Sequence, residues 1–177
     1  MKKLLLIVFA VLGSMAVNAQ DNVVKINPLS ILGGSDLISY ERYLTDHTSG
    51  VISAGFGGFK IGGFKYKSAG AGLQYRYYLS ESLFGFYGGA VLAFHKGKVE
   101  SKDELNLGTA SDTKFSSFGG GLKVGYQWIW DSGFSLDLNL GASYKKFNYD
   151  STADESSIGL KGNGIGPTLG LGLGYAF

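Results

Sequence analysis

The closing stretch Leu169-Gly-Leu-Gly-Leu-Gly-Tyr-Ala-Phe177 decides the fold. Large apolar side chains occupy every second position from Leu169 to Phe177, and glycine or alanine fills the positions between them. Such strict alternation predicts a β-strand with two unlike faces. A soluble barrel would need charged groups on its outer face, whereas small residues suit the crowded interior of a narrow barrel and large apolar residues suit a lipid-facing exterior. The sequence therefore predicts that the chain ends in a transmembrane β-strand.

Alternation of the same kind recurs along the rest of the chain and predicts seven further strands. The clearest outward face runs along Leu122, Val124, Tyr126, Trp128 and Trp130. Eight strands are typical of the smallest membrane barrels. We therefore expect an all-β fold, an eight-stranded antiparallel up-and-down transmembrane β-barrel. The expected strands are residues 23–32, 36–44, 51–59, 68–79, 84–99, 114–130, 133–148 and 165–177.

The connections between these strands are of two alternating kinds. Residues 46–50, 80–83 and 131–133 are short and polar, whereas 60–67, 96–113 and 149–164 are longer and more charged. Short turns at one rim and long loops at the other predict an outer-membrane barrel with both termini in the periplasm. Aromatic residues beside the short turns and the C-terminus are expected to form one interfacial girdle. They are Tyr40, Tyr43, Tyr75, Tyr77, Tyr78, Phe84, Phe86, Trp128, Trp130, Phe134, Tyr175 and Phe177.

The turn between Trp130 and Phe134 allows a prediction of register. A three-residue loop sets Trp128 opposite Leu136, so that every outward residue meets an outward partner. A two-residue loop would set outward residues opposite inward ones. Such a three-residue loop needs a positive φ at its third position, which Gly133 can supply.

Two prolines are expected to interrupt the strand ladder. Pro28 falls in the first expected strand and Pro167 at the start of the last, and these two strands must pair to close the barrel. Because proline cannot donate a backbone hydrogen bond, each should mark a bulge or an unpaired position.

The N-terminus has the pattern of a secretory signal peptide. Lys2 and Lys3 precede a short apolar run over residues 4–12, and Val17-Asn-Ala19 offers a cleavage site. We expect residues 1–19 to be the signal peptide and residues 20–177 to be the barrel domain. The chain has no cysteine, which excludes disulfides and a lipoprotein anchor and suits passage through an oxidising periplasm.

The charge balance gives no support to nucleic-acid binding. Without Lys2 and Lys3, basic and acidic residues are equal in number, so the barrel domain is formally neutral. With 29 glycines, 11 tyrosines and 12 phenylalanines but only two prolines, the composition suits many β-strands that contain glycine and have aromatic residues at their ends. The length fits one domain.

Polar and charged residues on the expected inner faces are interpreted as a structural network. An eight-stranded barrel is just wide enough for its own side chains, so these residues should fill the lumen and satisfy one another. A basic side chain facing lipid near mid-membrane would cost roughly 2–4 kcal/mol, which favours an inward position for Arg76 and Lys123. The network comprises Glu41, Gln74, Arg76, Lys123, Gln127, Asp137 and Asn139. We predict no catalytic residue, metal site or cofactor.

Five stretches together resemble a family of short outer-membrane β-barrel proteins of Gram-negative bacteria, often labelled porin-family or of unknown function. They are Lys25-Ile-Asn-Pro-Leu-Ser30, Ser39-Tyr-Glu-Arg42, Tyr75-Arg-Tyr-Tyr-Leu79, residues 118–130 and the closing Leu-Gly-Leu-Gly-Tyr-Ala-Phe. More distantly, the chain is similar to the small barrel domains of the OmpA and OmpX type. No peptidoglycan-binding domain is expected after the barrel. The resemblance implies a fold and an outer-membrane location, and it implies no reaction.

The last strand also resembles the C-terminal insertion signal of outer-membrane barrels, carried by Leu169, Leu171, Leu173, Tyr175 and Phe177. This resemblance implies recognition by the barrel-assembly machinery. The other expected partners are outer-membrane lipid and lipopolysaccharide, and an external partner at loops 96–113 and 149–164.

Four functions are compatible with the sequence. The first is a non-enzymatic outer-membrane barrel, either structural or presenting loops for surface interaction. The second is a small porin-like channel, which needs a wider lumen than eight strands normally leave. The third is a lipid A-modifying enzyme in which His95 acts as general base to a serine, although no nucleophile turn is present. The fourth is a secreted lipocalin-like binder, which would require the closing leucines to face inward.

Overall fold

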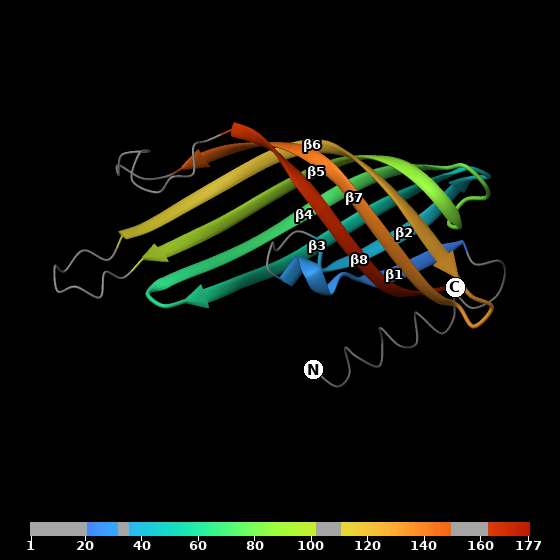
Figure 1. The fold of residues 1–177 in the computed structure, drawn as a ribbon, viewed down its shortest axis with the longest axis horizontal. Helices are drawn as coiled ribbons and strands as arrows, with labels where there is room; N and C mark the ends of the chain where they lie inside the picture. Colours follow the sequence, from blue (N-terminus) through green and yellow to red (C-terminus); the bar gives the residue numbers. More distant parts are fainter. Residues whose placement is uncertain (1–20, 32–35, 102–110, 150–162) are drawn as a thin grey trace.

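The computed structural model describes residues 21–31, 36–101, 111–149 and 163–177. Eight antiparallel strands pair in chain order, and the last pairs with the first, so the sheet closes into a barrel (Figure 1). The predicted all-β, eight-stranded antiparallel up-and-down fold is confirmed. The strands are β1 (Asn22–Ile26), β2 (Ile38–Thr45), β3 (Thr48–Ile61), β4 (Phe64–Tyr78), β5 (Gly85–Ser101), β6 (Ser111–Ile129), β7 (Phe134–Tyr149) and β8 (Asn163–Ala176). The expected signal peptide, residues 1–19, lies outside the described residues and stays a prediction.

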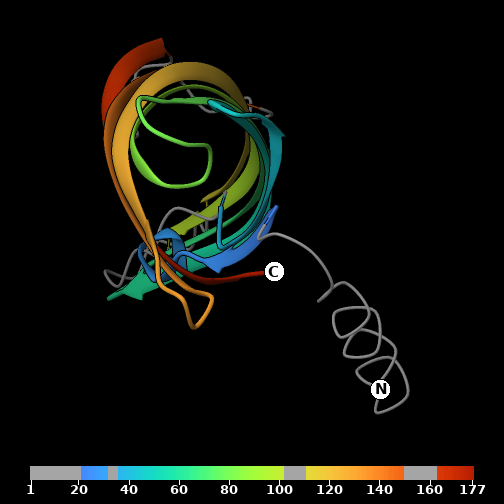
Figure 2. The same cartoon turned by 90° about the vertical axis from the view of Figure 1, so that its right-hand side faces the viewer.

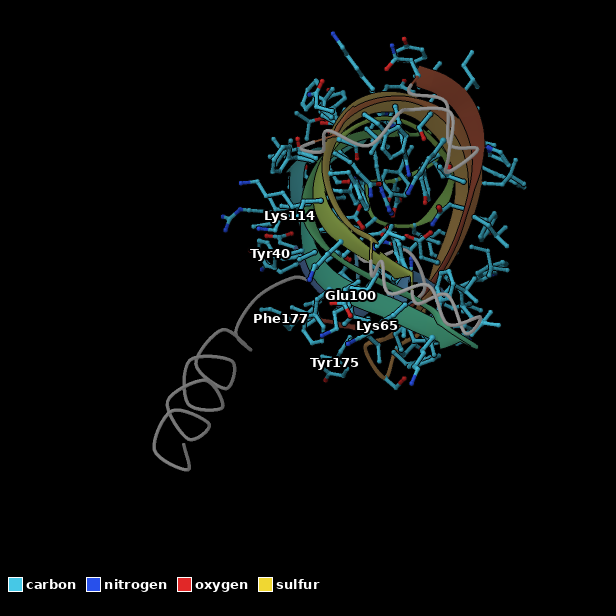
Figure 3. All side chains as sticks on the ribbon, turned by 90° about the vertical axis from the view of Figure 1, so that its left-hand side faces the viewer. Tyr40, Lys65, Glu100, Lys114, Tyr175 and Phe177 are labelled. Carbon is cyan, nitrogen blue, oxygen red and sulfur yellow. The ribbon has the colours of Figure 1, made fainter. Side chains whose placement is uncertain are left out.

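Over most of its length the barrel carries apolar side chains outside and polar or small ones inside. Leu169 is 72% exposed and Leu122 is 71% exposed, whereas Glu41, Gln127 and Asp137 are buried. Side chains surround the ring on its outer side and fill its centre in the view down the barrel (Figure 3). Because alternate residues of a strand point to opposite faces, the alternation in sequence separates these two environments.

The first strand is shorter than predicted, because its second half is helical. The chain leaves the sheet at Ile26 and forms a 3-10 turn, η1 (Pro28–Ile31), in which Ser30 N–H donates to the Asn27 carbonyl at 3.0 Å. A proline lacks a backbone N–H and has φ fixed near −65°, so it starts a helical turn more readily than it continues a ladder. The prediction of a strand over 23–32 is wrong for residues 27–31, and residue 32 lies outside the described residues. The described residues contain no helix long and apolar enough to cross a membrane.

The predicted loop over 60–67 is also wrong. β3 runs to Ile61 and β4 begins at Phe64, so only Gly62 and Gly63 connect them, and Gly62 has φ +55°. Two-residue hairpins require positive φ, which glycine adopts without strain. β5 and β6 likewise extend into the expected loop 96–113, up to Ser101 and from Ser111. Residues 102–110 and 150–162, the remainder of the two expected binding loops, lie outside the described residues.

The β6–β7 hairpin follows the predicted register. Trp128 pairs with Leu136, Trp130 N–H donates to the Phe134 carbonyl at 3.0 Å, and Gly133 has φ +82°. The connection is therefore the three-residue loop that the alternation required. All outward residues of β6 face outward residues of β7.

The seam that closes the barrel is short. β1 and β8 pair only from Val23–Ala176 to Ile26–Leu173, and the backbone of Phe177 adds two hydrogen bonds to Asn22. Pro167 lies beyond the last β1–β8 pair, and there it pairs only with β7. Beside the unpaired part of β8, η1 packs against β3 and β8.

At the end of the barrel opposite the chain termini, the side-chain pattern reverses. Val99 and Phe115 are buried inside, and Tyr66 stacks on Phe115 with ring centroids 5.9 Å apart. The outer face of the same strands carries the exposed lysines Lys67, Lys96 and Lys114. A strand with apolar residues inside and charges outside is the arrangement expected in water. This end of the barrel wall thus differs in side-chain pattern from the rest.

Candidate functional site

A cluster of ionised side chains fills the lumen near the end that carries the short turns. Its centre is two cations and two anions, Lys25 (β1), Arg76 (β4), Glu41 (β2) and Asp137 (β7), none of them more than 3% exposed. The formal charges cancel. A buried charge needs a partner and further hydrogen bonds to offset its desolvation, and here each cation contacts both anions. We call these four residues, with Gln127, Ser49, Tyr78 and Tyr87, the lumen cluster.

The contacts in the lumen cluster are short and shared. Lys25 Nζ lies 2.5 Å from Glu41 Oε2 and 3.0 Å from Asp137 Oδ2, and it donates to Gln127 Oε1 at 2.6 Å. Arg76 Nη1 lies 3.1 Å from the same Glu41 oxygen and 2.7 Å from the same Asp137 oxygen. The two cations therefore bridge the two carboxylates across the barrel.

Hydroxyl groups satisfy the remaining carboxylate oxygens. Tyr78 donates to Glu41 Oε1 at 2.7 Å, Ser49 donates to the same oxygen, and Tyr87 donates to Asp137 Oδ1 at 2.7 Å. The Arg76 guanidinium also lies over the Tyr87 ring, 4.2 Å from its centroid, a cation–π geometry. Seven of the eight strands contribute a side chain to the lumen cluster, so it crosses the whole lumen.

The sequence-predicted lumen residues do not all join this cluster. Glu41, Arg76, Gln127 and Asp137 belong to it. Two others lie at its edge: Gln74 Oε1 accepts from Arg76 Nη2 at 3.2 Å, and Asn139 Nδ2 donates to Asp137 Oδ1 at 3.2 Å. Lys123 lies apart, and its Nζ is 3.7 Å from Asp36 Oδ2. All seven face the interior, and their role as a structural network stays a prediction.

Sequence reasoning missed Lys25 and both tyrosines of the lumen cluster. Tyr78 was expected in the outer girdle, but it is fully buried and points inward, and Tyr43 packs partly buried against the base of the barrel. In the run Tyr75-Arg-Tyr-Tyr78, parity alone separates outward Tyr75 and Tyr77 from inward Arg76 and Tyr78. The same parity would have found Lys25, which alternates with Val24 and Ile26.

Glycines on facing strands make room for the lumen cluster. A Cβ atom on Gly174 would lie 2.5 Å from Lys25 Cγ, and one on Gly172 would lie 3.3 Å from Lys25 Cδ. A Cβ on Gly125 would lie 2.6 Å from Tyr87 Cζ. The Gly-Leu alternation of β8 therefore has a structural cause, because β8 gives the lumen cluster space instead of a side chain.

The connection between β4 and β5 lies beneath the lumen cluster and covers the end of the barrel. Figure 2 views this end, where the green connection crosses the opening of the ring. Leu83 in this connection is 3% exposed, packs with Val23 and Ala176, and has φ +70°. Its carbonyl accepts a hydrogen bond from Gln127 Nε2 at 2.8 Å. The apolar side chains Val23, Leu83 and Ala176 thus form one layer across the lumen, and the lumen cluster forms a polar layer next to it.

On the other side of the lumen cluster is a cavity of about 240 Å³. His95, Lys123, Lys145 and Asp36 line it, together with small residues of β6. His95 is 7% exposed and pairs across the sheet with Ser117, but among the described residues no hydrogen bond joins its imidazole to a serine. General-base activation of a serine needs such a contact. Nor do the described residues bring three potential metal-ligating side chains together.

The fold and the lumen together define an eight-stranded antiparallel β-barrel that is closed internally by a charged cluster. Residues 5–177 match a family of proteins of unknown function, DUF3575, and the chain belongs to that family. No curated protein matches the chain, and no solved structure does.

Proposed function

We propose that the protein is a non-enzymatic outer-membrane β-barrel, closed to solutes, that acts through its outer end. The observation that carries this proposal is the reversal of side-chain pattern along the barrel wall. The apolar outer band runs from Phe86 to Phe94 on β5 and from Phe134 to Tyr144 on β7. Those lengths match the roughly 9–11 residues that a transmembrane strand requires.

The connections support an orientation with both termini in the periplasm. The turns that join β2 to β3, β4 to β5 and β6 to β7, the start of β1 and the end of β8 lie at one end of the barrel, and the two-residue β3–β4 hairpin lies at the other (Figure 1). Aromatic residues such as Trp130, Phe134 and Tyr175 lie on the outer face there, as in an interfacial girdle. In this orientation the lumen cluster lies toward the periplasm, and the lysine-bearing end faces the exterior.

The lumen cluster argues against a porin-like channel. A conducting lumen needs a continuous aqueous path, and here four paired charges, two tyrosines and the buried Leu83 lie across it. His95 argues only weakly for an enzyme, since it lacks a hydrogen-bonded serine among the described residues. A surface-interaction or structural role needs neither a continuous aqueous path nor a histidine hydrogen-bonded to a serine.

Insertion into the outer membrane would give the protein two partners, which are membrane lipid and the barrel-assembly machinery. The outward residues Leu169 and Tyr175 are 72% and 58% exposed, and in a membrane this apolar face of β8 would meet lipid. Together with Leu171, Leu173 and Phe177, they would present the signal that barrel-assembly machinery reads. The likeness to OmpA- and OmpX-type barrels suggested by the sequence belongs to this proposal as well.

The first test is recovery of the full chain from the outer-membrane fraction, followed by SDS gels of unboiled and boiled samples. The proposal predicts outer-membrane recovery and faster migration of the unboiled, still-folded barrel. Recovery from the soluble periplasm with no heat-dependent shift would contradict it and would favour a secreted binder. A change in lipid A mass on overproduction, abolished by His95→Ala, would instead establish an enzyme.

A further inference from the structure

Lysines gather on the outer wall of the barrel just beyond the apolar band. Lys67 on β4, Lys96 and Lys98 on β5, and Lys114 on β6 occupy three neighbouring strands, and we call them the lysine patch. They line a shallow hollow of the outer surface together with Ala69 and Ser116. Lys114 is labelled in Figure 3, which views this end of the barrel.

The register places like charges directly opposite one another. Lys98 pairs across the sheet with Lys67 on one side and with Lys114 on the other. Like charges in directly opposite positions destabilise a sheet. Such a row is therefore best explained by an anion that approaches from outside the sheet.

Among the side chains that the structure describes, acidic groups do not neutralise the whole lysine patch. Glu100 lies 3.2 Å from Lys98 and 3.3 Å from Lys65, and hydrogen bonds from Lys98 and Lys65 hold the pKa of Glu100 below its usual value. This carboxylate is thus already engaged by two lysines. Among the described side chains, no carboxylate forms an ion pair with Lys67, Lys96 or Lys114.

The position of the lysine patch indicates what the anion is attached to. Phe94 and Phe118 pair directly below it, are 43% and 57% exposed, and end the apolar band on β5 and β6. Lys96 Nζ lies 5.6 Å from the centre of the Phe94 ring, so the charge and the apolar edge adjoin. A ligand that meets both has an acyl part beside the aromatic rings and a negative headgroup beside the lysines.

We propose that the lysine patch binds the phosphate groups of phosphorylated glycolipids in the outer leaflet. The inference rests on the proposed membrane location and specifies the lipid contact within it. Lysine is a compact positive charge suited to phosphate, and basic clusters beside an apolar span attract anionic headgroups.

The test uses the folded full chain in non-ionic detergent, titrated with bis-phosphorylated lipid A, with the bound lipid counted by native mass spectrometry. Lys114→Gln is compared with Arg42→Gln, which removes an exposed charge near the other rim. We expect about fivefold weaker binding for Lys114→Gln and roughly 25-fold weaker binding for Lys96→Gln/Lys114→Gln, since each lysine near an anionic lipid surface contributes about fivefold. Arg42→Gln should bind as the wild type does.

Three outcomes would overturn the inference: equal losses for Arg42→Gln and Lys114→Gln, equal binding of dephosphorylated lipid A, or competition by inorganic phosphate at matched concentration. The last would identify a site for small anions instead of lipid. Heat-dependent gel mobility shows that each variant is folded. A wild type without that mobility shift and outside the membrane fraction contradicts the proposed function itself. A membrane barrel whose lysine variants bind like the wild type contradicts only this inference.

Discussion

Asp137, like Glu41, binds both cations of the lumen cluster. One of its oxygens contacts both Lys25 and Arg76, and the other accepts from Tyr87 and Asn139. Because two cations share this carboxylate, losing its charge leaves both cations with Glu41 alone. The residue is 2% exposed, so water cannot take its place without rearrangement.

Asp137→Asn should therefore lower the free energy of unfolding by about 3 kcal/mol, the lower end of the range for breaking a buried ion pair. Urea unfolding in lipid vesicles, followed by the fluorescence of Trp128 and Trp130, measures the loss. Asp131→Asn, in an exposed turn, is the control and should leave the midpoint unchanged. Equal stability of Asp137→Asn and the wild type would show that the charges contribute nothing net.

Gly174 allows a test of the space that β8 leaves for the lumen cluster. A methyl group there would meet the Val24 backbone oxygen at 2.2 Å, Lys25 Cγ at 2.5 Å and Ser135 Oγ at 2.8 Å. Gly174→Ala should lower the free energy of unfolding by about 1–3 kcal/mol through overpacking. The matched control is Gly164→Ala in the same strand, because a Cβ at Gly164 would meet nothing within 4 Å. If both substitutions have the same effect, strand propensity and not packing explains it.

At the scale of elements, the β6–β7 hairpin shows how turn geometry sets the register. Gly133→Ala would hold a side chain at φ +82° and would place its Cβ 2.7 Å from the Tyr175 ring. We expect a loss of about 1–2 kcal/mol from the backbone conformation alone. Gly88→Ala, with open space around its Cβ, should change the unfolding midpoint little. A Gly133→Ala variant as stable as Gly88→Ala would refute the positive-φ requirement.

The strands followed from the sequence wherever alternation was strong. On β6, β7 and β8, parity determined which residues face outward and, with the turn at Gly133, which pairs meet. Prediction failed where local conformation decided the outcome, because Pro28 diverts the chain into η1 and Gly62 permits a two-residue hairpin. The charged stretch 96–101 was also predicted wrongly as part of a loop. It belongs to β5, because lysines on the outer face and Val99 on the inner face are compatible with a strand.

The lumen cluster was only partly predictable for a similar reason. Glu41, Arg76 and Asp137 were identified because strand alternation puts them on the predicted inner faces. Tyr87 lies in a segment of weaker alternation, and the contacts that Lys25 and Tyr87 each make with Asp137 form only when distant strands close into a ring. Lys25 and Asp137 are 112 positions apart in sequence, and no local pattern brings them together.

At the scale of the whole molecule, closure by the lumen cluster predicts that the barrel does not conduct ions in planar bilayers. Wild-type protein should give no discrete conductance steps, because side chains from seven strands cross the lumen, among them four paired charges. Arg76→Ala/Tyr87→Ala removes the side chains that stack at its centre, 4.2 Å apart, and should produce small conductance steps. Conductance steps of equal size in the wild type would show that the lumen cluster opens. They would favour the porin-like function over a closed barrel.

The central claim is that the reversal of side-chain pattern marks where the membrane ends. The chain has no native cysteine, so single cysteines can be introduced and labelled without background. In vesicles, a membrane-impermeant maleimide should leave Leu122→Cys and Leu140→Cys unlabelled until detergent is added, and it should label Lys96→Cys and Lys146→Cys at once. Equal labelling of both pairs in intact vesicles would place the apolar band in water and would contradict the membrane barrel.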